Sequence, residues 1–448
     1  MIIIGGGLAG LSAAIQAIEE GFRPIILERN RYLGGRVRSF YAEDFKQHMD
    51  NGQHILSAAY EETIWFLNKI GALQKVHFQE QFTVNFVKST RQRFLFKPYP
   101  LPAPLHFFVP LLFKSQYLKT GIGEYGNFIR QNLFFSETKL REMTVQEWLK
   151  NSRFNEHLIE FLFEPMTLAI LNTPIEQASA FLLQKAISKS FFYSRKNARL
   201  GIPGDWLSEI FVIPAQDIIA RHGGSIYHLS PVEKLIIAEN RVDAVVTRDG
   251  MLDAPYLICA VPPYALVKLL ETSNIAELNN LSRCAEQFNY HPIVTINIIL
   301  RKPLSGPFPI ALVASPIHWI FPHPQPAETT GEFGYALVIS AADRWREVPP
   351  EEMMSMVRRE LLRALQVDIQ GSHRLLRYKI IKEKRATISQ TPRANANRPA
   401  TTTALENLFL AGDWIDTGLP ATIESAIFSG RLAARSLESA FRSDSGSR

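Results

Sequence analysis

The chain begins Met1-Ile2-Ile3-Ile4-Gly5-Gly6-Gly7-Leu8-Ala9-Gly10, and this stretch decides the fold. It places a G-x-G-x-x-G motif directly after an apolar run and directly before a helix-like segment. Gly5 and Gly7 permit a tight turn and close approach of the backbone to a pyrophosphate, while Gly10 lets the helix pack against the strand. The N–H groups of the first helical turn, which includes Leu8 and Ala9, then face the negative charge. Alone the motif is weak, because other glycine-rich turns match it.

The residues that follow supply the missing context. A segment with apolar residues at helical spacing, 11–18, precedes a buried strand at 24–27. That strand ends at Glu28, eighteen positions after Gly10, where a carboxylate accepts hydrogen bonds from the ribose of an adenosine. An acid here disfavours the 2′-phosphate of NADP, so FAD or NAD is favoured. We expect Glu28, with the adjoining Arg29, at the ribose of a bound dinucleotide.

Composition describes an ordinary globular protein. The chain has 448 residues, 46% hydrophobic and 21% charged, which is enough for two domains. Its formal net charge of +6 fits simple solubility or attraction to an anionic membrane surface. No compact Lys/Arg block or nucleic-acid-binding motif appears, so no nucleic acid partner is expected. Cys259 and Cys284 lack metal-ligand spacing, which predicts no metal site and fits a reducing compartment.

The sequence contains no evident targeting or membrane-spanning segment. The first apolar run is too short for a secretory signal and leads into the glycine loop. No charge-free apolar span of about 18 residues occurs, so we expect no transmembrane helix. Only four residues precede Gly5, a short strand for one that holds a nucleotide site, which leaves open a start further upstream or a trimmed terminus.

The order of elements predicts an α/β protein with a discontinuous Rossmann-like domain and an α+β substrate domain. A helix-like segment at 206–221, a strand at 225–229, a meander over 231–248 and a strand at 256–261 indicate a second piece of the nucleotide-binding domain. The substrate domain is expected to hold helices at 145–149, 156–171 and 351–366 and strands at 294–300 and 335–340. We assign 1–89, 204–263 and 396–440 to the nucleotide-binding domain, 90–203 and 264–395 to the substrate domain, and 441–448 to a frayed tail.

A second motif lies near the C-terminus. An apolar strand at 407–411 leads into Gly412-Asp413, and Gly418-Leu419-Pro420-Ala421-Thr422-Ile423-Glu424-Ser425-Ala426 begins a long amphipathic helix. Pro420 suits the first helical turn. The N-terminus of such a helix stabilises an anion. An ordinary strand–turn–helix is the alternative, but its pairing with the N-terminal motif favours a cofactor site.

Together with Gly34-Gly35-Arg36, these motifs resemble the flavin-containing amine oxidase and carotenoid desaturase superfamily. The resemblance implies FAD rather than NAD as the cofactor. In that superfamily the arginine lies against the pyrophosphate, where its planar fork of donors suits two phosphates. The aspartate bonds the ribityl–phosphate region, a backbone position contacts the adenine, and the start of the last helix faces the flavin pyrimidine ring. In this chain, the positions that match these residues of the superfamily are Gly35, Arg36, Val232, Gly412, Asp413, Thr422 and Ile423.

The run Asp50-Asn51-Gly52-Gln53-His54 narrows the resemblance. By itself it is a polar turn, since Asn-Gly is a turn dipeptide, but it falls where the superfamily's chain passes beside the isoalloxazine. With residues 171–174, 319–321, 338–340, 384–387 and 418–426, it resembles the hydroxysqualene dehydroxylases, FAD-dependent desaturase-like proteins of bacterial hopanoid synthesis. Pro203-Gly204-Asp205 departs from their pattern, because relatives carry a second glycine there.

This resemblance implies reductive removal of an allylic hydroxyl from hydroxysqualene, giving squalene. Reduced FAD would supply hydride, and an acid would protonate the departing hydroxyl. His54 is the candidate acid, because an imidazole near its reference pKa donates a proton at neutral pH. A structural histidine bonded to the flavin or to a backbone carbonyl is the alternative. Asp50 is expected to orient His54 or to cap a turn, with Gly52 and Gln53 at the cofactor.

A lipophilic isoprenoid substrate requires an apolar entrance. Residues 94–114 are aromatic, interrupted by prolines and flanked by lysines. They are too broken to span a bilayer, but they suit an interface, with a buried core loop as an equal alternative. We therefore expect a cytoplasmic protein that associates peripherally with the inner face of the cytoplasmic membrane.

Other functions stay open at this point. A carotenoid or phytoene-type desaturase or isomerase has the same fold and the opposite direction of hydride flow. An amine or protoporphyrinogen oxidase would pass electrons to oxygen, and a structural flavin would carry no turnover. No second G-x-G-x-x-G occurs, so no NADPH site is expected and the electron donor is left unidentified.

Overall fold

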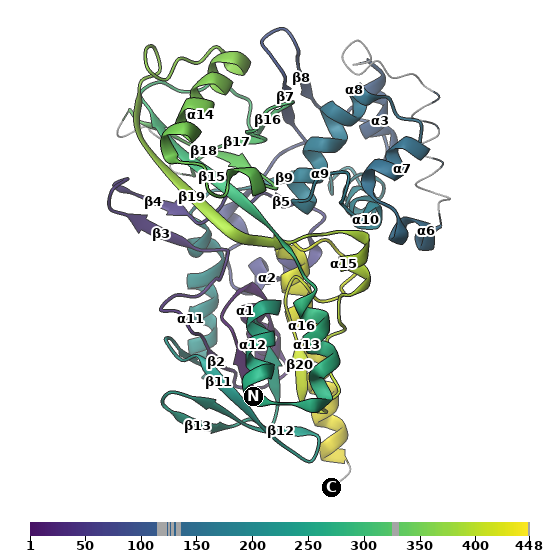
Figure 1. Cartoon of the computed structure of the whole chain (residues 1–448), viewed down its shortest axis with the longest axis vertical. Helices are drawn as coiled ribbons and strands as arrows, with labels where there is room; N and C mark the ends of the chain where they lie inside the picture. Colours follow the sequence, from purple (N-terminus) through teal and green to yellow (C-terminus); the bar gives the residue numbers. More distant parts are fainter. Residues whose placement is uncertain (114–122, 124–125, 127–129, 131–135, 325–330, 447–448) are drawn as a thin grey trace.

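The protein consists of two parts, each built around a β-sheet, shown one above the other in Figure 1. The structure is a computed structural model, and it describes residues 1–113, 123, 126, 130, 136–324 and 331–446. The lower part contains a five-stranded sheet and the upper part a seven-stranded sheet. The expected α/β fold is confirmed.

The lower sheet is wholly parallel and is assembled from three distant stretches of chain. Its strand order is β10-β2-β1-β14-β20. Because both faces are covered, β1, β14 and β20 read as continuous apolar runs. The strands are β1 (Ile2–Ile4), β2 (Ile25–Leu27), β10 (Ser225–Tyr227), β14 (Leu257–Cys259) and β20 (Leu408–Leu410).

Helices cover one face of this sheet, and a mixed layer covers the other. The helical face carries α1 (Leu8–Glu19), α11 (Ile213–Arg221) and α16 (Ile423–Gly446). A Cβ on Gly430 of α16 would lie 2.1 Å from the Ala9 carbonyl oxygen, so the close contact between α16 and α1 requires glycine. The opposite layer holds α12 (Pro263–Ser273), α13 (Asn279–Glu286), β11 (Val232–Ala238), β12 (Arg241–Thr247) and β13 (Gly250–Asp253).

The upper sheet is antiparallel except between β16 and β7. One face packs on α14 (Pro350–Leu365), and part of the other faces a cluster of helices rich in phenylalanine. Its long strands β15 and β19 extend down toward the lower part (Figure 1). In order, the strands are β19 (Leu375–Ile388), β15 (Tyr290–Leu300), β18 (Phe333–Ile339), β17 (Trp319–Pro322), β16 (Ile310–Leu312), β7 (Val84–Val87) and β8 (Arg93–Phe96).

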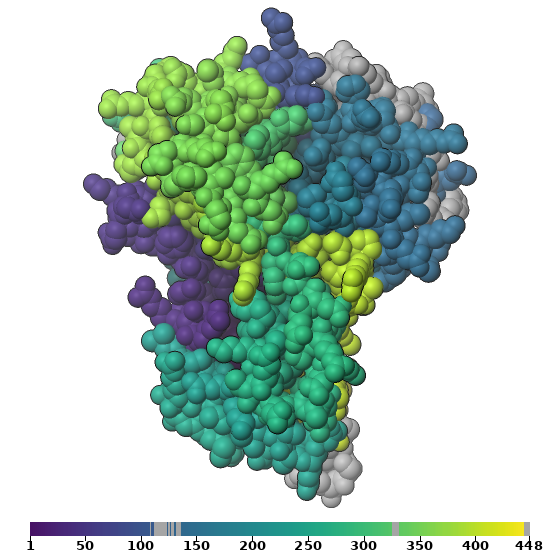
Figure 2. All heavy atoms as spheres, viewed as in Figure 1, coloured from purple at the N-terminus to yellow at the C-terminus, as the bar shows by residue number. Residues whose placement is uncertain are grey.

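Shorter elements complete the described chain, and Figure 2 shows segments from both ends of the chain at the surface between the two parts. The remaining helices are α2 (Glu61–Lys69), α3 (Leu105–Phe113), α6 (Glu137–Glu142), α7 (Val145–Asn151), α8 (Glu156–Leu158), α9 (Glu164–Leu171), α10 (Ala180–Phe191) and α15 (Pro392–Ala396). The remaining strands are β3 (Ser39–Ala42) with β4 (Gln47–Asp50), and β5 (Leu56–Ser57), β9 (Leu200–Pro203) and β6 (Val76–Phe78) in a third small sheet. Three-residue 3-10 helices lie at Leu73–Lys75, Ala276–Leu278 and Asp343–Trp345.

Two of the expected helices contain a π-helical stretch. These are Ile159–Phe163, just before α9, and Ser208–Val212, just before α11. Pro165 and Pro214 follow them closely. A proline has no N–H for the carbonyl four residues earlier and its ring crowds that carbonyl, so a wider turn accommodates it. The helix segments were therefore placed correctly in the sequence, but their internal geometry was not.

Two expected boundaries differ from the structure. The last helix begins at Ile423 rather than at Pro420, because Ala421 N donates to the Gln390 side chain at 2.7 Å and Arg398 binds the Leu419 carbonyl, which holds this stretch outside the helix. β7 lies within the segment 1–89, yet it pairs with β8 and β16 in the upper sheet. A hairpin cannot be divided between two domains, so the first lower segment ends before Val84.

The segment 94–114 forms β8, a proline-rich loop and α3. Phe94, Phe96, Phe107 and Leu111 are buried in the aromatic helical cluster, as the core-loop alternative predicts. The loop between them is exposed at several positions, and Lys114 lies outside the described residues. Among the described residues, no helix is both long enough and apolar enough to cross a bilayer.

Candidate cofactor and active site

The loop between β1 and α1 surrounds an open space. Gly5 has a φ of +102°, and a Cβ there would lie 2.7 Å from the Ala260 carbonyl oxygen, so only glycine fits. A Cβ on Gly10 would lie 2.0 Å from Gly5 O, which brings α1 onto the strand. At Gly7 a Cβ would meet no atom within 4 Å. The space beside Gly7, at the unpaired N–H groups of the first turn of α1, fits a pyrophosphate.

Glu28 follows β2 and is buried beside the glycine loop. Its Oε2 accepts a hydrogen bond from Gly6 N at 2.8 Å, and its Oε1 accepts from Asn30 N at 2.8 Å and Asn30 Nδ2 at 2.7 Å, which fixes the carboxylate and leaves a lone pair on Oε2 for a ribose hydroxyl. Ser230 N donates to Glu28 O at 2.9 Å, so Val232, at the start of β11, lies near the same point. Arg29 is exposed on the surface.

Arg36 joins the two ends of the chain. The Gly34-Gly35 turn, in which both residues have positive φ, sets it beside the glycine loop. Its Nη2 lies 2.7 Å from Asp413 Oδ1, and its Nη1 donates to Ala386 O at 2.8 Å. The Arg36 side chain nonetheless keeps 38% of its surface accessible. Both residues expected at the phosphates therefore meet at one point.

Asp413 is held in turn by a buried arginine that no motif indicated. Arg398 donates to Asp413 O and, at 2.5 Å, to Leu419 O, so it fixes the loop that precedes α16. Burial lowers the pKa of Arg398 to about 10, against the attraction of Asp413 and Asp416, so it stays charged at neutral pH. Gly412 N donates to Ser429 Oγ at 2.8 Å, which anchors the same loop to the helix.

The residues at the start of α16 differ in burial. Thr422 and Ile423 are partly exposed, whereas Glu424 is buried and accepts hydrogen bonds from Thr63 N at 2.9 Å and Glu62 N at 3.1 Å. These bonds cap the N-terminal turn of α2, and burial raises the pKa of Glu424. Thr422 and Ile423 are thus left at the helix end, where the resemblance expects the cofactor.

Asp50 serves as a helix cap. Its Oδ1 accepts hydrogen bonds from Ser39 Oγ at 2.6 Å and from Leu207 N at 3.0 Å. Burial raises the pKa of Asp50 to about 6, partly offset by these two bonds. No hydrogen bond in the described part of the chain joins Asp50 to His54. The carboxylate caps the start of the helical segment after Trp206, and it does not orient the imidazole.

The rest of this run lies against the upper sheet. Asn51 Nδ2 donates to Glu383 Oε2 on β19 at 3.1 Å, and a Cβ on Gly52 would lie 4.0 Å from Thr295 Oγ1 on β15. Gln53 is partly exposed. The run therefore sits where the lower and upper parts meet, close to the face of β15 that carries Thr295.

His54 is neutral at physiological pH. Burial, and then the charge of Arg36, lowers the pKa of His54 to about 4. The expectation that its pKa stays near the reference value is therefore wrong. Its Nε2 is buried and has no hydrogen-bond partner among the described residues. Tyr290 OH is a second buried polar atom without a partner in that part of the chain, and burial raises its pKa to about 12.

Two amide side chains that sequence reasoning missed tie the upper part to this site. Asn172 has φ of +47°, and its Nδ2 donates to Thr387 Oγ1 on β19 at 3.0 Å. Gln390 accepts from Ala421 N at 2.7 Å and donates to Leu171 O at 2.8 Å. The run 171–174 was noticed only through resemblance. An isolated glutamine gives no sequence signal of such a role.

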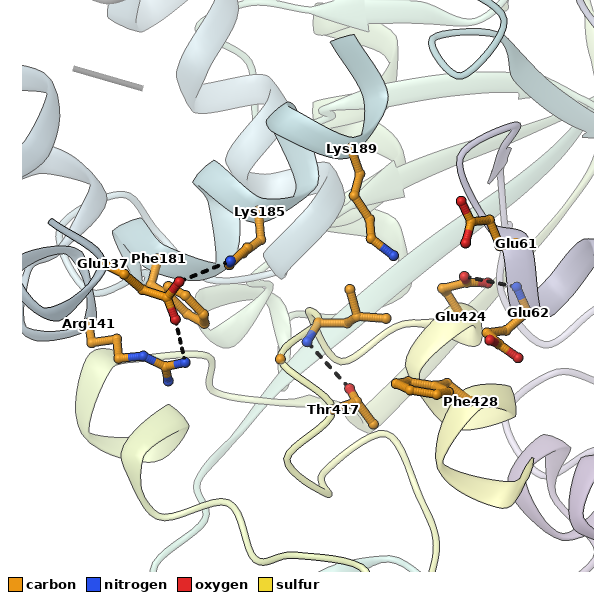
Figure 3. Close-up of a pocket in the computed structure, with 12 residues that line it drawn as sticks. Glu61, Glu62, Glu137, Arg141, Phe181, Lys185, Lys189, Thr417, Glu424 and Phe428 are labelled. Carbon is orange, nitrogen blue, oxygen red and sulfur yellow. Dashed lines mark hydrogen bonds and ion pairs between the residues drawn. The ribbon is translucent and has the colours of Figure 1, made fainter. Parts of the chain in front are cut away.

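A separate cavity of about 450 Å³ lies on the other side of the loop that leads into α16. Figure 3 shows Lys185 and Lys189 reaching in from α10, and Glu424 on the opposite wall. Three of the charged side chains that line the cavity already pair with one another, because Glu137 forms ion pairs with both Arg141 and Lys185. The glycine loop, Arg36 and His54 do not line this cavity, and we place the cofactor site at them.

The chain matches the model of the flavin containing amine oxidoreductase family over residues 8–437. It belongs to that family. Its relatives include hydroxysqualene dehydroxylases of Zymomonas mobilis and Rhodopseudomonas palustris, both 28% identical; each alignment covers 96% of this chain, and 97% and 96% of the relatives. A 15-cis-phytoene desaturase of Glycine max is 22% identical over 98% of this chain and 79% of its own length.

A solved oxidoreductase from Methanosarcina mazei shares the fold of this flavin containing amine oxidoreductase. Its TM-score is 0.73 at 15% identity, with 97% of this chain and 99% of that chain covered. As a member of the family, the protein is a flavin-dependent oxidoreductase whose cofactor is FAD. The residues present fit that group: Gly7 borders open space, Glu28 offers a buried carboxylate, and Arg36 offers a partly accessible cationic side chain.

Proposed function

We propose that the protein is a hydroxysqualene dehydroxylase, which reductively removes the allylic hydroxyl of hydroxysqualene to give squalene for bacterial hopanoid synthesis. The similarity to two enzymes of that name over nearly the whole of both chains carries this proposal. The phytoene desaturase relative is more distant, so the desaturase alternative is not favoured.

The reaction exchanges a C–O bond for a C–H bond and releases water, so it consumes one hydride and one proton. FAD, bound in its reduced form, supplies the hydride. We propose that Gly5, Gly7, Leu8, Ala9 and Gly10 hold the pyrophosphate with Gly35 and Arg36. Glu28 and Val232 take the adenosine end, and Gly412, Asp413, Thr422 and Ile423 take the ribityl and flavin end.

Loop 51–54 is the part of this site that we place at the reacting carbon. With a pKa of about 4, His54 carries no imidazolium proton to give at neutral pH. A neutral imidazole still donates an N–H hydrogen bond, and its unpartnered Nε2 is free to bind the departing oxygen. We therefore propose that His54 stabilises the leaving hydroxyl by hydrogen bonding, and that solvent supplies the proton that completes the departing water.

Anaerobic incubation of the reduced, FAD-loaded enzyme with hydroxysqualene tests the proposal. Squalene detected by mass, in amounts that match the flavin oxidised, is the expected result. Parallel samples carry phytoene with oxidised enzyme, and primary amines or protoporphyrinogen with oxygen. Turnover in either sample without squalene formation would reject the dehydroxylase in favour of that rival.

We further propose peripheral association with the inner face of the cytoplasmic membrane, because the substrate partitions into lipid. We assign different roles to the two parts of the protein. The lower part, which includes segments 1–83 and 396–440 and extends from residue 204 through α12 and α13 to residue 286, holds the cofactor, while the upper part receives the isoprenoid chain. The apolar helical cluster beside the upper sheet supports this assignment.

A further inference from the structure

Two surface loops are fixed side by side at one edge of the helical cluster. Residues 97–104 connect β8 to α3, whose first residue is Leu105, and residues 192–199 follow α10. Phe107 of α3 and Phe191 of α10 are both buried, with ring centroids 4.1 Å apart. Burial, and then the charge of Arg195, lowers the pKa of His106 of α3. The two loops, together with Leu105, are called the docking surface below.

The docking surface exposes three large side chains that carry apolar surface. Tyr193 is 76% exposed, and Leu105 and Tyr99 are 47% and 40% exposed. Beneath them, Phe107 and Phe191 belong to the cluster that extends to Trp319 on the upper sheet. Tyrosine at such a site suits a bilayer interface, because its ring enters the acyl boundary while its hydroxyl stays hydrated.

The same surface is cationic. Lys97, Arg195 and Lys196 are exposed, and none of them forms an ion pair with the described residues. Neither loop contains an aspartate or a glutamate, and Arg199 adds a fourth cation. Exposed cations and tyrosines on the same two loops match an anionic headgroup layer, where each Lys or Arg adds about 1 kcal/mol of attraction.

We propose that the docking surface binds the protein to an anionic phospholipid bilayer. Single-stranded nucleic acid also binds aromatic and basic side chains. A bilayer is favoured because Leu105 and the prolines around it offer no stacking face and lie over the apolar cluster. The proposal rests on the proposed function only for the reason why the protein would bind a bilayer. The binding itself requires no turnover.

Flotation of the full-length, FAD-loaded protein with vesicles tests the docking surface. Wild type should float with vesicles of phosphatidylglycerol and phosphatidylcholine at low salt, and much less with pure phosphatidylcholine or at high salt. The triple variant Lys97→Glu, Arg195→Glu and Lys196→Glu should bind at least about 100-fold more weakly. Tyr193→Ser should bind about tenfold more weakly.

Matched controls lie on the lower part. Lys234→Glu reverses an exposed cation and Met251→Ser removes a side chain that is 65% exposed, and both should float like wild type. Flavin absorbance and melting temperature confirm that each variant is folded and loaded. Wild type that stays unbound at low salt, or docking variants that float as the controls do, would overturn the proposal.

Two further experiments distinguish bilayer binding from nucleic-acid binding and from the proposed enzymatic function. An oligonucleotide that binds the surface while vesicles do not would assign it to nucleic acid and reject the bilayer. Dehydroxylation of substrate in detergent micelles should be unchanged in the docking variants. If micellar turnover is absent in wild type as well, the proposed function fails, while flotation still decides the docking surface.

Discussion

Arg36 and Asp413 lie 377 positions apart and form an ion pair with 2.7 Å between Nη2 and Oδ1. Each belongs to a motif that the sequence assigned to the same cofactor. The Arg36 side chain keeps 38% of its surface accessible, and a guanidinium has five N–H donors, more than its bonds to Asp413 and Ala386 use. We therefore propose that the two motifs form one anion-binding unit.

Arg36→Lys should weaken FAD binding about 10- to 100-fold. Lysine keeps the charge but cannot bond Asp413, the Ala386 carbonyl and a phosphate at once, and hydrogen bonds to charged groups contribute about 1.5–3 kcal/mol. Titration of the apoprotein by flavin fluorescence measures the dissociation constant. Arg359→Lys, at an exposed position of α14 in the upper part, is the control and should bind FAD like wild type. Equal affinities in both variants would contradict the role of Arg36.

Gly7→Ala and Gly10→Ala should fail in different ways. At Gly7 a methyl group meets only open space, so the apoprotein should keep its melting temperature while FAD binding weakens. At Gly10 the methyl group would lie 2.0 Å from Gly5 O, so the protein itself should be destabilised or fail to fold. Thermal melts of apo and FAD-loaded protein separate the two effects. Normal FAD affinity in Gly7→Ala would place the cofactor elsewhere.

Asp50→Asn should make the protein more stable at neutral pH. The pKa of Asp50 in the folded state, about 6, exceeds its ordinary value of 3.8. The protonated carboxyl therefore adds stability that is complete below pH 3.8 and is lost as the pH rises through 6. A shift of about two units corresponds to about 3 kcal/mol. Asparagine keeps an oxygen for Ser39 and Leu207 without ionising.

Melting temperatures across this pH range check the effect. The difference between Asp50→Asn and wild type should grow from pH 4 to pH 7. Asp249→Asn, in an exposed turn, should show no such trend. A constant difference at all pH values would mean that Asp50 does not titrate near pH 6.

His54→Ala should retain FAD and lose about 100-fold or more in dehydroxylation rate, and His54→Gln should recover part of that loss. Glutamine supplies an N–H donor but no ionisable proton, so the pair distinguishes hydrogen bonding from proton donation. The wild-type rate should show no step near pH 6.5, because the pKa of His54 is about 4. A rate that falls as the pH rises through 6.5, with His54→Gln as inactive as His54→Ala, would instead show that protonated His54 is the acid.

The sequence predicts the lower sheet well because its signals are local. The glycine loop, Glu28 and Gly412-Asp413 each adjoin a short buried strand, and in a parallel sheet the ends of such strands meet at one edge. The geometry at Gly5 and Gly10 then follows from the motif itself.

Long-range contacts explain what the sequence could not predict. Asp50 bonds Leu207, 157 positions away, and nothing near Asp50 marks that partner. The low pKa of His54 arises from burial by distant segments, so the residue type alone misleads. Arg398 and Gln390 bind backbone atoms of the loop before α16. Because the partner is the backbone, no complementary side chain marks these contacts in the sequence.

β20 supplies the outer strand of the lower sheet and the loop that carries Asp413. During synthesis the glycine loop leaves the ribosome long before β20, which pairs with β14, and before the loop that carries Asp413. Domains generally fold from the N-terminus as they emerge, but the lower sheet is incomplete until β20 has been made. We therefore expect flavin to be incorporated only after the synthesis of β20, and the newly made chain to keep an incomplete lower sheet until then.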